Sequence, residues 1–378
     1  MSRYDWLIVG AGITGCTLAE RLAASGMRVL LIERREEPGG HCHDSFDASG
    51  VLIHKYGPHI FHTDNAAVYA YLSRFTEWHP YAHHVEADLG GRHVPLPCNL
   101  NTIRDLWPGD EGERLERALL SRFAYGTQLS VFDLAGLPEF SDSAAFILET
   151  LFEGYSEKQW GRWRGELDAS VFARVPIRLS RDNRYFTDTF QGIPSGGYTE
   201  MMTRMVSGSP RIELLLGQEY DGVSSKARYN GILFTGRIDE FFDYSRGPLP
   251  YRSVRFQHDT VQSPSVLQRT GTVNYPGLTP AHTRSTEFRI LTGQQADFTT
   301  LCREFPVDAD DTNEAMYPVP CDTSRAVLDE YAQLAARESR ARFCGRLGSY
   351  RYLNMDQAVE AALDLAATIT GDRSSIVG

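Results

Sequence analysis

The fold is decided by residues 4–33, which read YDWLIVGAGITGCTLAERLAASGMRVLLIE. Residues 4–9 contain the apolar run Trp6–Val9 and predict a buried strand, and residues 28–32 predict a second strand. The residues between them, 15–25, have the periodicity of a helix. The stretch therefore predicts a strand, a helix and a second strand, the βαβ unit with which a dinucleotide-binding fold begins.

Three glycines join the first strand to the helix with the spacing GxGxxG. Gly10 permits the tight turn, Gly12 lets a pyrophosphate approach the backbone, and Gly15 lets helix and strand pack closely. The helix N-terminus then offers N–H groups and a positive dipole to phosphates. Glu33, 18 residues beyond Gly15, ends the second strand, where a carboxylate accepts hydrogen bonds from a ribose hydroxyl and repels a 2′-phosphate.

A second glycine pair follows the acidic residue in the run ERREEPGG, residues 33–40. Gly39 and Gly40 at this place resemble flavoproteins with two dinucleotide-binding domains more than simple NAD dehydrogenases. FAD is therefore favoured over a nicotinamide cofactor.

Beyond this unit the chain changes character. Helical periodicity dominates from about 64 to 167, with 66–75, 112–124 and 142–154 as the best candidate helices. Short β-rich runs follow Pro176, at 212–216, 231–235, 253–258 and 271–275. The end returns to α/β character, with a strand at 341–344 and an alanine-rich helix at 355–369.

These patterns predict an α/β protein whose Rossmann-like FAD-binding domain is assembled from both ends of the chain. A helical insertion and an antiparallel β-sheet substrate domain complete the expected organisation. The expected bounds are 1–78, 195–246 and 320–378 for the FAD-binding domain, 79–170 for the helical domain, and 171–194 with 247–319 for the β-sheet domain.

Composition excludes several classes of protein. The net charge is −11 and the basic residues are scattered, which argues against a nucleic-acid partner. The six cysteines form no close pair, so they predict neither a zinc site nor a disulfide framework, and a reducing, cytoplasmic setting is expected. No segment reaches about 18 uninterrupted apolar residues, so no membrane span is expected. The spacing of the histidines at 41–62 also fits no metal site, and no metal is predicted.

Several longer blocks are similar to the UDP-galactopyranose mutase family, and the resemblance extends from the first strand to the last helix. The most specific blocks are HKYGPHIFHT at 54–63, GYSEKQWG at 154–161, RVPIR at 174–178, DNRYF at 182–186, QGIPSGGY at 191–198, and GRLGSYRYLNMD at 345–356. Shorter blocks are YRS at 251–253 and HTR at 282–284.

This resemblance implies a flavin that acts as a nucleophile and not as a redox agent. N5 of reduced FAD attacks the anomeric carbon and expels the nucleoside diphosphate, the adduct opens to an iminium, and the sugar recloses as a furanose. No electrons are gained or lost overall. Such a covalent route divides one high barrier into two lower ones, and the departing diphosphate needs cationic groups.

The resemblance also implies roles for individual residues. Arg174 and Arg284 are the expected diphosphate clamps, since a guanidinium offers paired donors to phosphate oxygens, and His62 is the third expected catalytic residue. The expected cofactor residues are Gly10, Gly12, Gly15, Glu33, Gly39, Gly40, His41, His59, Arg346, Asn354 and Met355. The expected substrate residues, in addition to the two arginines, are Phe152, Tyr155, Trp160, Tyr185, Arg252, Tyr317, Tyr352 and His83.

The sequence departs from the family pattern mainly around the expected sugar pocket. His41 and His83 stand where the family has Asn, Ala281-His282 replace Pro-Tyr, Met316 replaces a Tyr, and Asn354 replaces an Asp. Because losing one hydroxyl partner can shift preference strongly, the sugar stays open. UDP-galactose is the first expected substrate; the alternatives are a dTDP-deoxyhexose such as dTDP-fucose, UDP-N-acetylgalactosamine, or a GDP-sugar.

Two other readings compete with the mutase. An amine-oxidase-type flavin oxidoreductase shares the glycine pairs, and a non-catalytic flavoprotein shares the fold. As partners, the resemblance implies a second copy in a homodimer and an external reductant such as NAD(P)H or a reduced flavin, since no second complete nucleotide fingerprint is visible.

Overall fold

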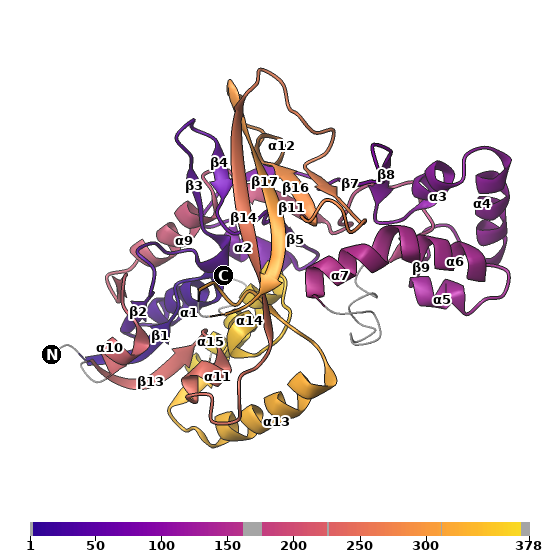
Figure 1. Ribbon diagram of the computed structural model, residues 1–378. Helices are drawn as coiled ribbons and strands as arrows, with labels where there is room; N and C mark the ends of the chain where they lie inside the picture. The colour runs from indigo at the N-terminus through magenta and orange to yellow at the C-terminus, as the bar shows by residue number, and fades with distance from the viewer. Residues whose placement is uncertain (1–2, 162–175, 225–226, 311, 372–378) are drawn as a thin grey trace. The chain divides into compact units, whose positions relative to one another are not determined.

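The computed structural model describes residues 3–161, 176–224, 227–310 and 312–371, drawn in colour in Figure 1. These residues form two compact units. Unit 1 consists of Met1–Tyr81, Asp188–Arg252 and Ala309–Gly378, and unit 2 consists of Ala82–Thr187 and Ser253–Asp308.

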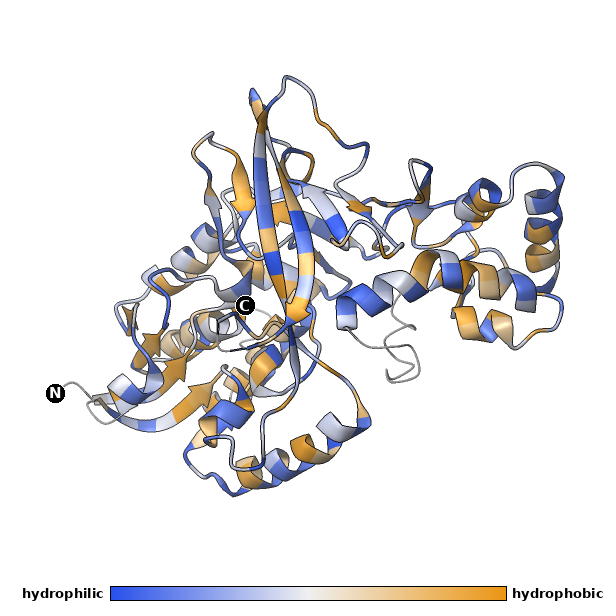
Figure 2. Cartoon of the chain, in the orientation of Figure 1, coloured by the Kyte–Doolittle hydropathy of each residue, from blue (hydrophilic) through white to orange (hydrophobic). Residues whose placement is uncertain are grey.

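Unit 1 contains a parallel sheet of five strands in the order β12-β2-β1-β13-β19. The strands are β1 (Arg3–Val9), β2 (Val29–Ile32), β12 (Ile212–Leu215), β13 (Arg228–Phe234) and β19 (Ala341–Phe343). Every residue of β2 is buried, as expected for a parallel strand covered on both faces. In Figure 2 the strands β1 and β2 are largely coloured as hydrophobic.

The helix that follows β1 contacts this sheet, and helices from later in the chain pack against that helix. Helix α1 (Ile13–Ala24) packs against α15 (Met355–Thr370) and against α9 (Tyr198–Ser207). The predicted βαβ unit, the last strand and the last helix are all present, and the predicted α/β fold class is confirmed.

Smaller elements complete unit 1. Strands β5 (Phe61–Thr63), β11 (Phe190–Pro194) and β6 (Trp78–Pro80) form an antiparallel sheet in that order, and β3 (Asp44–Phe46) pairs with β4 (Leu52–His54). The remaining elements are η1 (Gly40–Cys42), α2 (Ala66–Leu72), α10 (Tyr220–Ser224), α11 (Ile238–Phe241), β18 (Tyr317–Pro318), α13 (Asp322–Arg337) and α14 (Gly345–Gly348).

Unit 2 contains a sheet in the order β14-β17-β16-β15-β7-β8. Its strands are β14 (Tyr251–Gln262), β17 (Phe298–Asp308), β16 (Arg284–Glu287), β15 (Thr272–Asn274), β7 (Val85–Asp88) and β8 (His93–Leu96). The pairs β15 with β16, β16 with β17, and β7 with β8 are antiparallel, whereas β15 and β7 are parallel. The first two residues of β14 belong to unit 1 and pair with β18.

The helices of unit 2 lie mostly between residues 100 and 160. They are α3 (Leu100–Leu106), α4 (Asp110–Arg122), α5 (Val131–Ala135), α6 (Ser141–Ile147), the π-helical η2 (Leu148–Glu153) and α7 (Gly154–Trp160), and α12 (Phe288–Thr292) follows later. Strands β9 (Gln128–Leu129) and β10 (Ile177–Arg178) form a short antiparallel pair.

The expectation that helices dominate from 64 to 167 is wrong for residues 78–96, which form β6, β7 and β8. Strand β7 alternates buried Val85 and Ala87 with half-buried Glu86 and Asp88, which is a period of two. Each strand has only three or four residues, too few for the alternation to stand out among helical segments. The predicted three-domain bounds stay a prediction.

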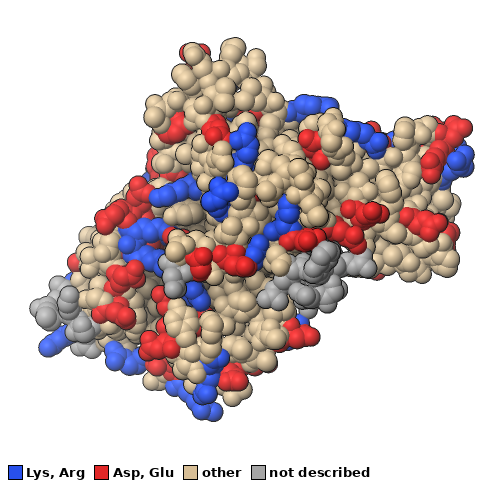
Figure 3. Space-filling view, viewed as in Figure 1, with Lys and Arg blue, Asp and Glu red and all other residues tan. Residues whose placement is uncertain are grey.

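Four further features concern membrane spans, metal sites, cysteines and surface charge. Within the described ranges, no helix is long and apolar enough to cross a membrane. The same residues contain no group of three or more His, Cys, Asp or Glu side chains placed to hold a metal ion. All six cysteines are buried free thiols. On the face shown in Figure 3, basic and acidic side chains are interleaved.

Candidate functional site

The turn between β1 and α1 can be built only with glycine at two positions. Gly10 has φ +99°, and a Cβ added there would lie 2.3 Å from the hydroxyl oxygen of Thr235. A Cβ on Gly15 would lie 1.9 Å from the carbonyl oxygen of Gly10, so the helix passes directly over the turn. Gly12 caps α1 without a side-chain hydrogen bond, which leaves the first N–H groups of the helix for a ligand.

The second glycine pair packs against the first. Gly39 and Gly40 both have positive φ, +119° and +57°, and Gly39 donates its N–H to the carbonyl of Ala11 at 2.9 Å. A Cβ on Gly40 would lie 2.9 Å from Cα of Gly12. The two glycine motifs, separate in the sequence, therefore form one backbone surface.

Glu33 is buried at the end of β2. Its carboxylate accepts the N–H of Ala11 at 2.9 Å and the N–H of Arg35 at 3.1 Å. The oxygen that accepts the Arg35 N–H also accepts Nη1 of the same arginine, at 3.5 Å. These bonds fix the carboxylate beside the glycine turn, and the oxygen bonded to Ala11 keeps a further lone pair for a ribose hydroxyl.

A cavity of about 470 Å³ opens onto these groups in unit 1. Its volume lies within the range of roughly 300 to 1,000 Å³ that is usual for ligand pockets. The unit 1 cavity is lined by all the predicted cofactor residues except Gly15, namely Gly10, Gly12, Glu33, Gly39, Gly40, His41, His59, Arg346, Asn354 and Met355. Gly15 contributes to the packing beneath the turn instead.

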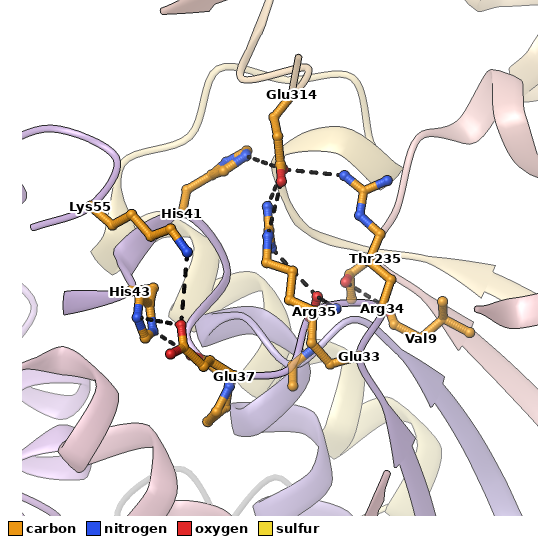
Figure 4. Close-up of polar contacts among 12 residues, drawn as sticks. Val9, Glu33, Arg34, Arg35, Glu37, His41, His43, Lys55, Thr235 and Glu314 are labelled. Carbon is orange, nitrogen blue, oxygen red and sulfur yellow. Dashed lines mark hydrogen bonds and ion pairs between the residues drawn. The ribbon is translucent and has the colours of Figure 1, made fainter. Parts of the chain in front are cut away.

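An ion-pair cluster at the cavity was not predicted from the sequence. Glu314 contacts Arg34 at 3.2 Å, Arg35 through two hydrogen bonds, and His41 at 3.7 Å (Figure 4). Burial alone would raise the pKa of Glu314, but the neighbouring His41 ring and the two arginine charges hold it well below its ordinary value. Burial lowers the pKa of His41. We call these four residues the Glu314 cluster.

The 54–63 block contains three histidines, and the two predicted site residues among them, His59 and His62, lie in different surroundings. His59 lines the cavity, its Nδ1 lies 2.9 Å from the carbonyl of Gly57, and burial, helped by the charge of His54, lowers its pKa to about 3. His62 is not among the lining residues of the cavity; its Nδ1 lies 3.2 Å from a carboxylate oxygen of Asp188. The catalytic role expected for His62 stays a prediction.

Four other predicted residues meet in unit 1. The rings of Tyr317 and Tyr352 stack with centroids 5.5 Å apart, and the guanidinium of Arg346 lies 5.2 and 5.1 Å from them. Arg346 also donates to the carbonyl of Leu353 at 2.8 Å. Arg252 is buried and pairs with Tyr317 between β14 and β18. Cofactor and substrate candidates thus share this cluster.

The aromatic substrate candidates of unit 2 lie around α7. Phe152 is the second-last residue of the π-helical segment, and Tyr155 and Trp160 lie on α7 itself. Phe152 and Trp160 are each 7% exposed, so both also serve as core residues, whereas Tyr155 is half-buried. A π-helical turn is uncommon and occurs frequently at functional sites, where it changes the direction in which the following residues point.

Arg284 begins β16, with its Nε 2.6 Å from a carboxylate oxygen of the buried Glu304 on the neighbouring strand. This charged hydrogen bond fixes the plane of the guanidinium. The sequence does not predict Glu304 as a site residue. Its role becomes visible only when β16 pairs with β17 and places Glu304 opposite Arg284. The other predicted clamp, Arg174, lies outside the described residues.

His83 and Tyr185 also lie together in unit 2. Their rings form an edge-to-face pair at 5.7 Å, and Tyr185 donates its N–H to the carbonyl of His83 at 2.6 Å. His83 is 5% exposed. Of the other departures from the family pattern, Met316 is 2% exposed and His282 packs edge-on against Tyr275.

A parallel sheet, a glycine turn, a buried carboxylate after the second strand and a cavity above them define a dinucleotide-binding α/β protein. Two sequence families match: an NAD(P)-binding Rossmann-like domain at residues 8–75 and UDP-galactopyranose mutase at residues 150–352. The chain belongs to the UDP-galactopyranose mutase family.

Full-length relatives agree with this assignment. The chain is 33% identical to a probable UDP-galactopyranose mutase of Klebsiella pneumoniae, over 97% of this chain and 94% of that protein. It is also 33% identical to a dTDP-fucopyranose mutase of Escherichia coli, over 95% and 97%. The protein is thus an isomerase of the mutase type that interconverts pyranose and furanose forms of a nucleotide sugar.

Solved structures show the same fold. A crystal structure of reduced UDP-galactopyranose mutase matches with a TM-score of 0.77 and 16% identity, covering 100% of this chain and 97% of that one. A putrescine oxidase matches with a TM-score of 0.60 and 15% identity, covering 98% and 99%. The fold alone therefore does not separate mutases from amine oxidases; the sequence relatives do.

Proposed function

We propose that this enzyme converts UDP-galactopyranose to UDP-galactofuranose with FAD as its cofactor, active in the reduced state. The main support for a mutase is the 33% identity to two sugar-nucleotide mutases over nearly the full length of the chain. The glycine surface and Glu33 fit a dinucleotide, because they offer uncapped N–H groups to a pyrophosphate and a fixed carboxylate to a ribose. When bound, the reduced flavin supplies the nucleophile for the anomeric carbon.

In this proposal Arg284 stabilises the leaving diphosphate, together with Arg174. Glu304 holds Arg284 through Nε, which keeps the planar fork in one orientation before the charge on the diphosphate develops. Preorganised donors of this kind contribute more than mobile ones because they need no reorganisation during the reaction.

The roles of the remaining candidates follow from their surroundings. Within unit 2, Phe152, Tyr155 and Trp160 bind the nucleobase. Within unit 1, Tyr317 and Tyr352 stack beside Arg346, Arg252 pairs with Tyr317, and these residues donate to the nucleotide. A tyrosine suits this place because its ring is apolar and its hydroxyl donates.

A second candidate substrate is dTDP-fucose or a related dTDP-deoxyhexose. The chain is as similar to the dTDP-fucopyranose mutase as to the probable UDP-galactopyranose mutase, so identity does not separate them. His83, where the family has Asn, is buried beside Tyr185 and changes the hydrogen-bonding groups available to the sugar. UDP-N-acetylgalactosamine and GDP-sugars are the remaining alternatives.

The test is a substrate panel under anaerobic conditions. Dithionite-reduced enzyme is mixed in turn with UDP-galactose, dTDP-fucose, UDP-N-acetylgalactosamine and a GDP-hexose, and products are separated by chromatography, with oxidised enzyme as the control. We expect the highest kcat/KM for UDP-galactose. Greater turnover of dTDP-fucose would show that dTDP-fucose is the preferred substrate. If none of the four nucleotide sugars is isomerised, the proposal is refuted.

We also propose that an external reductant, NAD(P)H or a reduced flavin, activates the enzyme in the cytoplasm, and that the enzyme works as a homodimer. Stopped-flow reduction of the bound flavin by each reductant and sedimentation of the purified protein test these two points.

A further inference from the structure

Lys158 joins helix α7 to the loop that connects β15 to β16, residues 275–283. Its Nζ lies 2.6 Å from the carbonyl oxygen of Tyr275, 3.0 Å from that of Pro280 and 2.9 Å from that of His282. An ammonium group has three N–H donors, and each finds a carbonyl here. One side chain thus holds both ends of the loop.

The same face of α7 approaches this loop at a second point. A Cβ on Gly154 would lie 2.4 Å from the carbonyl oxygen of Pro276, so the backbones are in close contact there. Gly154 and Lys158 are four residues apart and therefore lie above one another on one side of the helix. Because the contact is made at two points along the helix, α7 can neither slide nor rotate on the loop without breaking it.

The loop leads directly into Arg284. Thr283 donates its N–H to the carbonyl of Glu304 at 2.9 Å, and Glu304 also holds Nε of Arg284. The ring of His282 packs between Tyr275, at 4.5 Å, and Phe305, at 5.6 Å. A displacement of the loop by loss of its Lys158 contacts would therefore be transmitted to the start of β16.

The choice of a lysine here is costly in stability. The side chain is half-buried, and burial lowers the pKa of its ammonium to about 8. An apolar side chain would avoid that cost and still cover the loop, but it would leave three carbonyls without this donor. The cost is understandable if the loop must be held in one conformation.

We propose that Lys158 is a positioning residue that fixes the nucleobase-binding helix α7 relative to Arg284, so that nucleobase and diphosphate are recognised as one rigid unit. The proposal rests on the function proposed above, since it uses Arg284 as the diphosphate ligand. It predicts that Lys158 affects nucleotide binding through Arg284.

A double-mutant cycle tests this coupling. UDP is titrated into native enzyme, Lys158→Met, Arg284→Ala and the double variant, with the dissociation constant followed by tryptophan fluorescence and dTDP titrated in parallel. We expect Lys158→Met to weaken UDP binding about tenfold in the native background and less than about twofold when Arg284 is already absent. Lys158→Arg should restore part of the loss, and Lys55→Met, the same change at an exposed lysine of unit 1, should have no effect.

The outcomes distinguish the positioning role of Lys158 from the diphosphate role of Arg284. Equal losses from Lys158→Met in both backgrounds, or native affinity in Lys158→Met, would overturn the positioning role. If Arg284→Ala alone binds UDP and dTDP like the native enzyme, the proposed diphosphate role of Arg284 fails instead. Melting temperature and flavin content of each variant identify any that fails to fold; Gly154→Ala, which disturbs the same contact from the other point, then serves in place of Lys158→Met.

Discussion

The unit 1 cavity and the α7 region of unit 2 are built in different ways. Around the cavity, a Cβ on Gly15 or Gly40 would meet backbone atoms, and a Cβ on Gly10 would meet the hydroxyl of Thr235. Around α7, apart from the close backbone contact at Gly154, side chains hold segments that are far apart in the sequence: 117 residues separate Lys158 from Tyr275. The cavity wall is therefore rigid because of steric exclusion, whereas α7 is held by polar contacts that single substitutions remove.

This difference predicts how each region responds to mutation. Where a glycine lies against fixed backbone, adding a methyl group should abolish binding and destabilise the fold, because the neighbouring backbone atoms cannot move away. Loss of a polar contact should have a smaller, graded effect, because the remaining partners can rearrange and a water molecule can replace the lost side chain. The four changes below test this contrast, from the largest expected effect to the smallest.

Gly15→Ala should abolish flavin binding and destabilise the fold by several kcal/mol, because its Cβ would lie 1.9 Å from the carbonyl oxygen of Gly10. The bound flavin is quantified by absorbance after purification, and stability by urea unfolding. Gly222→Ala, where no atom lies within 4 Å of the added Cβ, is the control. Full flavin content in Gly15→Ala would show that the turn tolerates a side chain and is not sterically closed.

Arg284→Ala should lower kcat/KM at least about 100-fold, as removal of a preorganised donor to a developing anion does. Glu304→Gln should cost less, about tenfold, because the guanidinium stays but loses its charged partner. Arg325→Ala, at a surface ion pair on α13, is the matched control. If Arg284→Ala retains native kcat/KM, then the diphosphate is stabilised elsewhere.

The contrast also explains what the sequence could predict. The glycines and Glu33 were predictable because backbone geometry demands particular residues at a particular spacing. Glu314 was not, because a single carboxylate in a polar loop resembles any surface residue until the fold brings Arg34 and Arg35 to it.

In unit 2 the residues on α7 and Arg284 came from family resemblance, and their partners did not follow from it. Lys158 binds backbone carbonyls, which every sequence contains, so no pattern marks its role. The strands β7 and β8 were missed because they are short. The contacts of Lys158 and the strands β7 and β8 depend on pairing between segments far apart in the sequence, and not on local propensity.

Lowering the pH should destabilise unit 1 through His59. Its pKa of about 3 in the folded state lies below the ordinary value of 6.5, so the unfolded state binds more protons at intermediate pH. Stability is therefore lost as the pH falls below 6.5, by about 2 kcal/mol at pH 5. Urea unfolding of the native protein and of His59→Asn at pH 7.5 and pH 5 measures this contribution; an identical drop in both would show that His59 does not cause it.

Glu314→Gln should have the smallest effect, a loss of about 1 kcal/mol, because the Glu314 cluster is only partly buried. The depressed pKa of Glu314 means that its contribution is present near neutral pH and is lost as the pH falls through the acid range. Melting temperatures at low and high salt measure it. The comparison is Glu330→Gln, at an exposed pair with Arg246, which should change nothing; equal effects at both sites would remove any special role for the cluster.

We propose that the unit 1 cavity holds a flavin that this mutase uses without net oxidation. The most direct measurement is anaerobic turnover of fully reduced enzyme with excess nucleotide sugar, with the flavin spectrum followed alongside the product. The account predicts many turnovers toward the same pyranose–furanose equilibrium from either side, with the flavin still reduced at the end. Oxidation of one flavin per product formed, or peroxide production from amines in air without isomerisation, would contradict it.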